Sequence, residues 1–223
     1  SSAAARSGTT EAPRIKDEGD AEVGRKMIAR LSMVSALLLL LVMSMSACGG
    51  TSGLESIVTP TLPATIPDQN EVDPATGLHV TGRPVVVDLA EYRLEVGGKV
   101  DRQLALSYED ILGMPKTTAT LTIVCSQAMF VVFADTATWS GVPLKTVLET
   151  AGVQPGATEV TMKAADGFLT TIPLEVALDP ENLLAYELEG EPLPVLHGFP
   201  LRAVVPHRPG WNSIKWLTDI VVD

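Results

Sequence analysis

Residues 196–217 read LHGFPLRAVVPHRPGWNSIKWL, and this stretch places a short apolar strand between two polar loops. His197 and Arg202 precede the AVV strand and the loop with Lys215 follows it, so both loops are able to reach one ligand. Arg offers a planar fork to phosphate oxygens, Lys offers a point charge, and backbone N–H groups of a Gly- and Ser-containing loop complete an anion site. The stretch therefore predicts an anion site, with ordinary surface charges at strand ends as the alternative.

The composition of the chain indicates one globular domain of ordinary size. The sequence has 223 residues, 46% of them hydrophobic, and a formal net charge of -11, with two cysteines and three histidines. A nucleic-acid interface needs clustered Lys and Arg to neutralise phosphates, and the sequence shows no such clustering. We therefore expect small molecules or other proteins as partners, and no nucleic acid.

The N-terminal part has the features of an export signal. Residues 31–47 (LSMVSALLLLLVMSMSA) form an apolar run that follows Arg25, Lys26 and Arg30. A positive flank, a short apolar core and small residues at the exit are typical of a signal peptide. The sequence MSAC, which ends at Cys48, resembles the lipobox of bacterial lipoproteins, in which the cysteine carries the lipid. An uncleaved membrane anchor is the alternative, since the run is near the lower length for a span.

These features divide the chain into four segments. Residues 1–26 are polar, and we expect them to be disordered or to precede a true start at Met27. Residues 27–48 form the predicted lipoprotein signal peptide, and residues 49–79, of which the first part is rich in Thr, Pro, Ser and Gly, form a flexible linker. Residues 80–223 form the folded domain. We expect this domain to lie outside the cytoplasm, attached to the cell membrane through its lipid anchor.

The folded domain alternates short strands with short helices. Apolar and β-branched runs predict strands, and apolar residues at helical spacing predict helices, the first of them capped by Ser107. The expected strands cover residues 92–98, 118–125, 159–166, 168–174, 183–193, 201–206 and 215–223. The expected helices cover residues 108–114, 142–152 and 173–180. Mixed short strands with segregated short helices predict an α+β domain.

Cys125 ends one of the expected buried strands. If Cys48 is consumed by lipidation, Cys125 is the only thiol left, and an intrachain disulfide cannot form. One interpretation is that Cys125 is a small apolar residue at the end of a core strand. The other is that its thiolate binds a soft metal or acts as a nucleophile.

Five segments, in order, resemble the molybdopterin-binding oxidoreductase domain of the sulfite oxidase family, from about Tyr92 to Asp223. They are TLTIVC, WSGVPLKTVLETAGV, DGFLTTIPLEVAL, LLAYELEGEPLPVLHGFPLRAVVP and SIKWLTDIVV, of which HGFPLR followed by SIKWL is the most specific part. The resemblance implies the mixed-sheet fold of that family and a molybdenum-molybdopterin cofactor. Within WSGVPL we assign Trp139 to packing.

The resemblance also implies roles for individual residues. Cys125 stands where the family's cysteine gives its thiolate to molybdenum, which makes it the expected metal ligand and catalytic residue. His197 and Arg202 match the positions that contact the pterin and its phosphate. The loop that holds the phosphate end is matched by Ser213, Ile214 and Lys215.

Three positions depart from the sulfite oxidase pattern. Uncharged residues follow Cys125 where the family has an Arg, Phe168 stands nearest to the family's Tyr, and Asn212 replaces a second Arg. A desolvated sulfite dianion would be poorly compensated without these groups. We therefore expect a neutral oxo-compound such as a sulfoxide, small or protein-bound, as substrate. The possible substrate pocket comprises Gln127, Phe168, His207 and Asn212, with an exposed loop as the alternative for His207.

The reaction that the resemblance implies is a two-electron oxidoreduction. The organic cofactor and its metal would supply the chemistry, and the protein would position them. Because the sequence shows no haem-binding segment, we expect a separate redox protein to donate or accept the electrons. The alternative is a non-catalytic lipoprotein that keeps the fold as a binding or scaffolding module.

Overall fold

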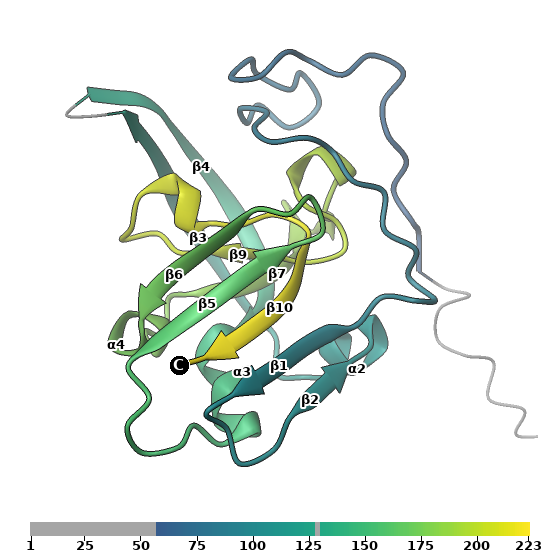
Figure 1. Ribbon diagram of the computed structural model, residues 1–223. Helices are drawn as coiled ribbons and strands as arrows, with labels where there is room; N and C mark the ends of the chain where they lie inside the picture. Colours follow the sequence, from purple (N-terminus) through teal and green to yellow (C-terminus); the bar gives the residue numbers. More distant parts are fainter. Residues whose placement is uncertain (1–56, 128–129) are drawn as a thin grey trace, which may run out of the picture. The chain divides into compact units, whose positions relative to one another are not determined.

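The computed structural model describes residues 57–127 and 130–223 (Figure 1). The predicted signal peptide and Cys48 fall in residues 1–56, outside the described residues, as do residues 128–129. Every helix in the described part is too short or too polar to cross a membrane. The lipid anchor and the export of the domain therefore stay predictions.

The first sheet has five strands and places the C-terminal strand at its middle. Its order is β2 (Leu104–Leu106), β1 (Leu94–Gly98), β10 (Leu217–Val222), β5 (Glu159–Ala164) and β6 (Leu169–Pro173). Strands β1 and β10 run parallel, whereas the other neighbours are antiparallel. Since β10 begins where the polar stretch of residues 196–217 ends, this sheet anchors the end of that stretch.

The second sheet contains the strand that carries Cys125. Its order is β3 (Thr117–Gln127), β4 (Phe130–Pro143), β7 (Leu183–Leu188) and β8 (Glu191–Pro192), and β9 (Arg202–Val204) pairs with β7. Strands β3 and β4 form a long antiparallel hairpin that extends beyond the neighbouring strands (Figure 1). All three residues of β9 are buried, so this strand carries Arg202 into the interior.

Short helices connect the strands. They are α2 (Tyr108–Leu112), α3 (Leu144–Ala151), α4 (Leu174–Ala177) and the 3-10 turns η2 (Val195–His197) and η3 (Gly210–Asn212). The predicted cap is confirmed, because the Ser107 hydroxyl accepts a bond from the Asp110 N–H at 3.1 Å. Helix α3 buries the apolar residues whose spacing predicted it, which are Leu144, Val147, Leu148 and Ala151.

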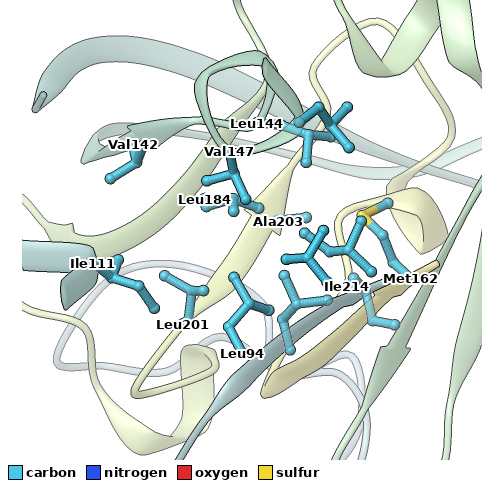
Figure 2. Close-up of a cluster of buried hydrophobic side chains, with 14 of the residues drawn as sticks. Leu94, Ile111, Val142, Leu144, Val147, Met162, Leu184, Leu201, Ala203 and Ile214 are labelled. Atoms are coloured by element: carbon cyan, nitrogen blue, oxygen red, sulfur yellow. The ribbon is translucent and has the colours of Figure 1, made fainter. Parts of the chain in front are cut away.

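A large hydrophobic core joins the two sheets and the helices α2 and α3 (Figure 2). Its members include Leu94, Ile111, Val142, Leu144, Val147, Met162, Leu184, Leu201, Ala203 and Ile214. A smaller cluster lies along the second sheet and contains Leu121, Ile123, Ala137, Trp139, Leu183, Leu188 and Val204. Because both sheets contribute to one core, the folded part is a single domain of the predicted α+β class.

Residues 68–82, which we call the N-terminal arm, pack on this domain. Within the arm, the Asp73 N–H donates to the Leu78 carbonyl at 2.8 Å. Asp73 and Leu78 are only 5% and 4% exposed. The prediction of a flexible linker over residues 49–79 is therefore corrected for its last part, because the arm buries a carboxylate and an apolar side chain there.

Candidate active site

A cavity of about 380 Å³ lies where the N-terminal arm, the β3–β4 hairpin and the loops around β9 meet. Six residues assigned from the sequence line it, which are Cys125, His197, Arg202, Ser213, Ile214 and Lys215. Phe168, one of the predicted substrate-pocket residues, lines it as well. The strand that carries the thiol therefore faces the same space as Arg202 and Lys215.

Cys125 lies near the end of β3, at an irregularity in its pairing with β4. Cys125 pairs with Phe133, and the register then shifts between Cys125 and Ser126. Shifts of this kind bend a strand and redirect its side chains. The thiol is free, partly exposed and at the wall of the cavity. Cys125 is thus not the dry core residue of the simpler interpretation.

Arg202 is buried and donates its hydrogen bonds to backbone oxygens. Its Nη1 donates to the carbonyl of His197 and its Nη2 to the carbonyl of Ser213, both at 3.1 Å. The guanidinium carbon lies 4.8 Å from the centre of the Trp139 ring, which is a cation–π geometry. Burial lowers the pKa of Arg202 to about 10, so the side chain stays charged at neutral pH.

Lys215 is a second buried cation at the same cavity. Its Nζ donates to the carbonyl of Thr81 at 3.0 Å and to the carbonyl of Leu196 at 2.8 Å. Burial, and then the charge of Arg202, lowers the pKa of Lys215 well below its ordinary value. Among the described residues, neither cation forms an ion pair with a carboxylate. Buried charges are usually paired, so these two fit an anionic ligand in the cavity.

His197 is held by the N-terminal arm. Its Nε2 lies 3.0 Å from Oδ2 of Asp73 and 2.8 Å from the Thr76 hydroxyl. Burial, and then the charge of Lys215, lowers the pKa of His197 to about 4, so the imidazole is neutral at pH 7. Burial acts to raise the pKa of Asp73, but hydrogen bonds from the Ala75 N–H, His197 and Thr76 outweigh it, and that pKa lies below its ordinary value.

The two polar loops of residues 196–217 pack tightly against each other at Gly198. Its φ of 112° is in the region that favours glycine, and a Cβ there would lie 3.0 Å from the Lys215 Cβ and 3.1 Å from the Arg202 Cβ. On the second loop, the Ser213 hydroxyl accepts a bond from the Val205 N–H at 3.0 Å. The backbone near both cations is therefore fixed by close packing and by hydrogen bonds.

Two predicted substrate-pocket residues do not line the cavity. Asn212 is 6% exposed, and its Nδ2 donates to the Thr170 hydroxyl at 2.7 Å, which ties η3 to β6. The His207 side chain is 67% exposed and pairs with Glu181, as the exposed-loop alternative expected. The structure thus corrects both assignments, and the side chain of Gln127 lies outside the described residues.

The cavity also contains residues that the sequence analysis did not select. His79 and Asp135 line it, as do the exposed aromatic side chain of Trp211 and the carboxylate of Asp166. Asp135 was detectable in principle, because it lies at every-second-residue spacing with the apolar Phe133 and Ala137 and so places a carboxylate on the core side of β4. His79 carried no such signal, since it lies in the segment expected to be a linker.

Trp139 presents an unpaired donor at the cavity wall. The residue is 0% exposed, and its indole Nε1 has no hydrogen-bond partner among the described residues. Leaving a buried donor unpaired costs about 1–3 kcal/mol. Together with Arg202 and Lys215, this N–H makes a donor set that fits an organic anion with several acceptor atoms.

A sequence model of the oxidoreductase molybdopterin-binding domain matches residues 80–223. The chain belongs to this family. It is 38% identical over 154 residues to the uncharacterized oxidoreductase YuiH of Bacillus subtilis, covering 69% of this chain and 76% of that protein. It is also 38% identical over 162 residues to the mitochondrial sulfite oxidase of Drosophila melanogaster, covering 61% of this chain and 28% of that enzyme.

Two further relatives carry informative names. A protein of Azospira oryzae named "Putative protein-methionine-sulfoxide reductase subunit YedZ1" is 30% identical over 136 residues, covering 61% of this chain and 50% of that protein. The crystal structure of the sulfane dehydrogenase SoxCD from Paracoccus pantotrophus superposes with a TM-score of 0.57 at 28% identity, covering 62% of this chain and 40% of that one. The chain thus spans half or less of these two proteins.

These comparisons establish the family, the fold, the cofactor and the class of protein. The predicted sulfite-oxidase-type fold is confirmed, and the cofactor is molybdenum-molybdopterin. The chain is a molybdopterin-dependent oxidoreductase, so the scaffolding alternative has no support from its relatives. The unpaired N–H of Trp139 and the cations Arg202 and Lys215, which lack a carboxylate partner in the described residues, fit such a cofactor together with the free thiol of Cys125.

Proposed function

We propose that this domain catalyses a two-electron reaction on a neutral oxo-compound such as a sulfoxide, outside the cytoplasm, with a separate redox protein as electron donor or acceptor. The observation that carries the proposal is the convergence of the Cys125 thiol with Arg202 and Lys215 on one cavity. A thiol alone would suit many reactions. A thiol beside two unpaired buried cations suits a metal held on an anionic organic cofactor.

In this proposal each residue has a distinct task. The Cys125 thiolate binds molybdenum, while Arg202 and the 213–215 loop hold the pterin and its phosphate. His197 contacts the pterin as a neutral imidazole, with Asp73 fixing the orientation of its ring. When bound, the cofactor supplies two-electron oxygen-atom transfer. The protein places the substrate and keeps competing water out.

The charges at the cavity favour a neutral substrate over sulfite. Arg202 and Lys215 are buried and donate hydrogen bonds to backbone carbonyls. Both are assigned to the cofactor. The carboxylates of the lining, within the described part, are Asp135, which is paired with His79, and Asp166, which would repel an anion. Phe168 and Trp211 are 47% and 53% exposed and offer an aromatic entrance. The sulfoxide reductase name of the Azospira relative supports the same choice.

The proposed location and partner rest on the sequence and on one relative. The apolar run before Cys48 supports export and a lipid anchor at the cell membrane. The Azospira relative is named as a subunit, which supports the need for a second protein. A lipid anchor would keep the domain close to membrane-bound electron carriers.

Metal analysis tests the cofactor assignment. The full chain, produced in a host that makes the cofactor, should contain molybdenum, whereas the Cys125→Ser protein should contain none. The matched control is Cys48→Ser, which should retain molybdenum but lose membrane association. Molybdenum retained by Cys125→Ser would contradict the assigned metal ligand.

Turnover assays test the substrate class. The parent protein should reduce a dialkyl sulfoxide with a reduced dye as electron donor. It should oxidise sulfite poorly with an oxidised dye as acceptor. Sulfite oxidation at rates typical of an enzyme would overturn the substrate assignment and leave the cofactor assignment intact.

A further inference from the structure

We propose that His79, oriented by Asp135, donates a proton to the oxygen atom of the substrate during reduction. The inference rests on the proposed function and adds a catalytic residue to it. His79 and Asp135 lie on different elements, the N-terminal arm and β4, and both line the cavity that Cys125 faces.

Two hydrogen bonds hold the imidazole in one orientation. The His79 Nδ1 lies 2.6 Å from Oδ1 of Asp135, and the backbone N–H of His79 donates to Oδ2 at 2.9 Å. Both carboxylate oxygens are therefore directed at the same residue. Because a carboxylate accepts and does not donate, the Nδ1 atom carries a proton in this pair. The Nε2 atom has no hydrogen-bond partner within the described part of the chain, so it is available to a ligand.

The strand register places this imidazole against the residue that is paired with Cys125. Cys125 on β3 is directly opposite Phe133 on β4, and directly opposed residues of a strand pair have Cβ atoms about 4.5–5.5 Å apart. The His79 ring stacks on the Phe133 ring with centroids 4.1 Å apart and planes 8° from parallel. Asp135 follows two positions later on the same face of β4. His79 of the dyad therefore packs directly on Phe133, the strand partner of Cys125.

The dyad is accessible from the cavity while its carboxylate is shielded. The His79 side chain is 25% exposed and the Asp135 side chain is 10% exposed. A catalytic acid needs to reach its substrate, whereas the group that orients it works best out of water. Asp135 therefore acts as the positioning residue of the pair.

Other charged groups at the cavity have different partners or positions. His197 is bound to Asp73, and Lys215 and Arg202 donate to backbone carbonyls. Asp166 accepts a bond from the Phe168 N–H at 2.9 Å. Among the described residues that line the cavity, His197 is assigned to the pterin, so His79 is the remaining imidazole with a nitrogen open to a substrate.

The chemistry of sulfoxide reduction requires such a group. The net reaction breaks the sulfur–oxygen bond and converts a sulfoxide, two electrons and two protons into a sulfide and water, and the reduced redox protein would supply the two electrons. His79, as an imidazolium whose Nδ1–H stays bound to Asp135, delivers one of these protons from Nε2 and is reprotonated from solvent through the cavity opening. The second proton comes from water at the same opening. General acid catalysis of this kind contributes about 10²–10⁴-fold to a rate.

The test compares His79→Gln with the matched control His207→Gln in the cofactor-loaded full chain. His207 is exposed and outside the cavity, so its variant should behave as the parent protein does. His79→Gln should keep its molybdenum and its thermal midpoint but lose about 100-fold in kcat. The pH dependence of kcat should flatten. Loss of molybdenum in His79→Gln, or a kcat within twofold of the parent value, would overturn the inference.

Two further measurements test the role of His79, and the second does not depend on the substrate assignment. Free imidazole should restore part of the activity of His79→Ala, because it can occupy the vacated space and donate the same proton. The reduction potential of the molybdenum centre should fall with rising pH in the parent and depend less on pH in His79→Gln. The potential needs no substrate, so it tests the proton path even if sulfoxides are not turned over. An unchanged pH dependence of the potential would count against His79.

Discussion

Asp73 in the N-terminal arm and His197 before β9 lie 124 positions apart in the chain, yet their side chains meet at 3.0 Å in the interior. The contact closes the arm over the wall of the cavity. It also couples stability to pH, because burial holds the pKa of His197 at about 4 against an ordinary value of 6.5. The unfolded chain therefore binds a proton between these two values that the folded chain does not bind.

We predict that the cofactor-free protein loses stability as the pH falls from about 6.5 to about 4. Stability from His197 is fully present above the higher value and is lost below the lower one, and the loss is on the order of 3 kcal/mol. Asp73, whose pKa is lowered, adds a further loss at still lower pH. Urea unfolding at a series of pH values measures this. His197→Asn should reduce the pH dependence, whereas His207→Gln should preserve it.

The sequence predicted those site residues that stand out in a local sequence pattern. Cys125 was visible as a thiol at the end of an apolar strand, and Arg202 and Lys215 as cations flanking a short strand. Cys125 and Arg202 sit on β3 and β9, and Lys215 lies two residues before β10, so their convergence followed once the fold resembled a known family. The structure places all three at one cavity.

The sequence could not predict contacts made by the N-terminal arm. His79 meets Asp135 across 56 positions, and the arm has the composition of a linker. Its order comes from long-range partners, which local propensity does not encode. The assignment of Asn212 to the substrate pocket was wrong for a related reason. It came from matching a family position, and the sequence did not show that the Asn212 amide donates to the Thr170 hydroxyl.

Lys215→Met should separate the stability of the domain from its ability to hold the cofactor. The lysine is a buried cation without a carboxylate partner in the described structure, and an apolar side chain of similar length avoids its desolvation cost. We expect the cofactor-free variant to be about 1–2 kcal/mol more stable in urea unfolding. Its molybdenum content should fall sharply. Lys145→Met, at an exposed helix position, should change neither quantity, and an unaltered molybdenum content in Lys215→Met would contradict the assigned phosphate site.

Trp139→Phe should weaken cofactor binding at little cost to the cofactor-free fold. The change keeps an aromatic ring beneath Arg202 and removes an indole N–H that has no partner in the described part of the protein. We expect cofactor dissociation to become about tenfold faster, as for the loss of one hydrogen bond. Trp216→Phe provides the contrast, because its indole N–H already donates to the Val195 carbonyl at 2.9 Å. That variant should lose about 1 kcal/mol of unfolding free energy instead. Equal cofactor release from Trp139→Phe and the parent would show that the indole N–H does not face the cofactor.

Gly198→Ala should disturb both cations at once. The substitution adds a Cβ 3.0 Å from the Lys215 Cβ and 3.1 Å from the Arg202 Cβ, at a φ of 112°. Backbone strain of this kind costs about 1–3 kcal/mol, and relief of the contacts requires the two loops to separate. The matched control is Gly190→Ala, where φ is 84° but nothing lies within 4 Å of the added Cβ. Both variants carry the strain of a positive φ, so a larger loss of molybdenum and of unfolding free energy in Gly198→Ala isolates the effect of loop separation. Equal losses in the two variants would mean that close packing of the loops is not what holds Arg202 and Lys215 at the cavity.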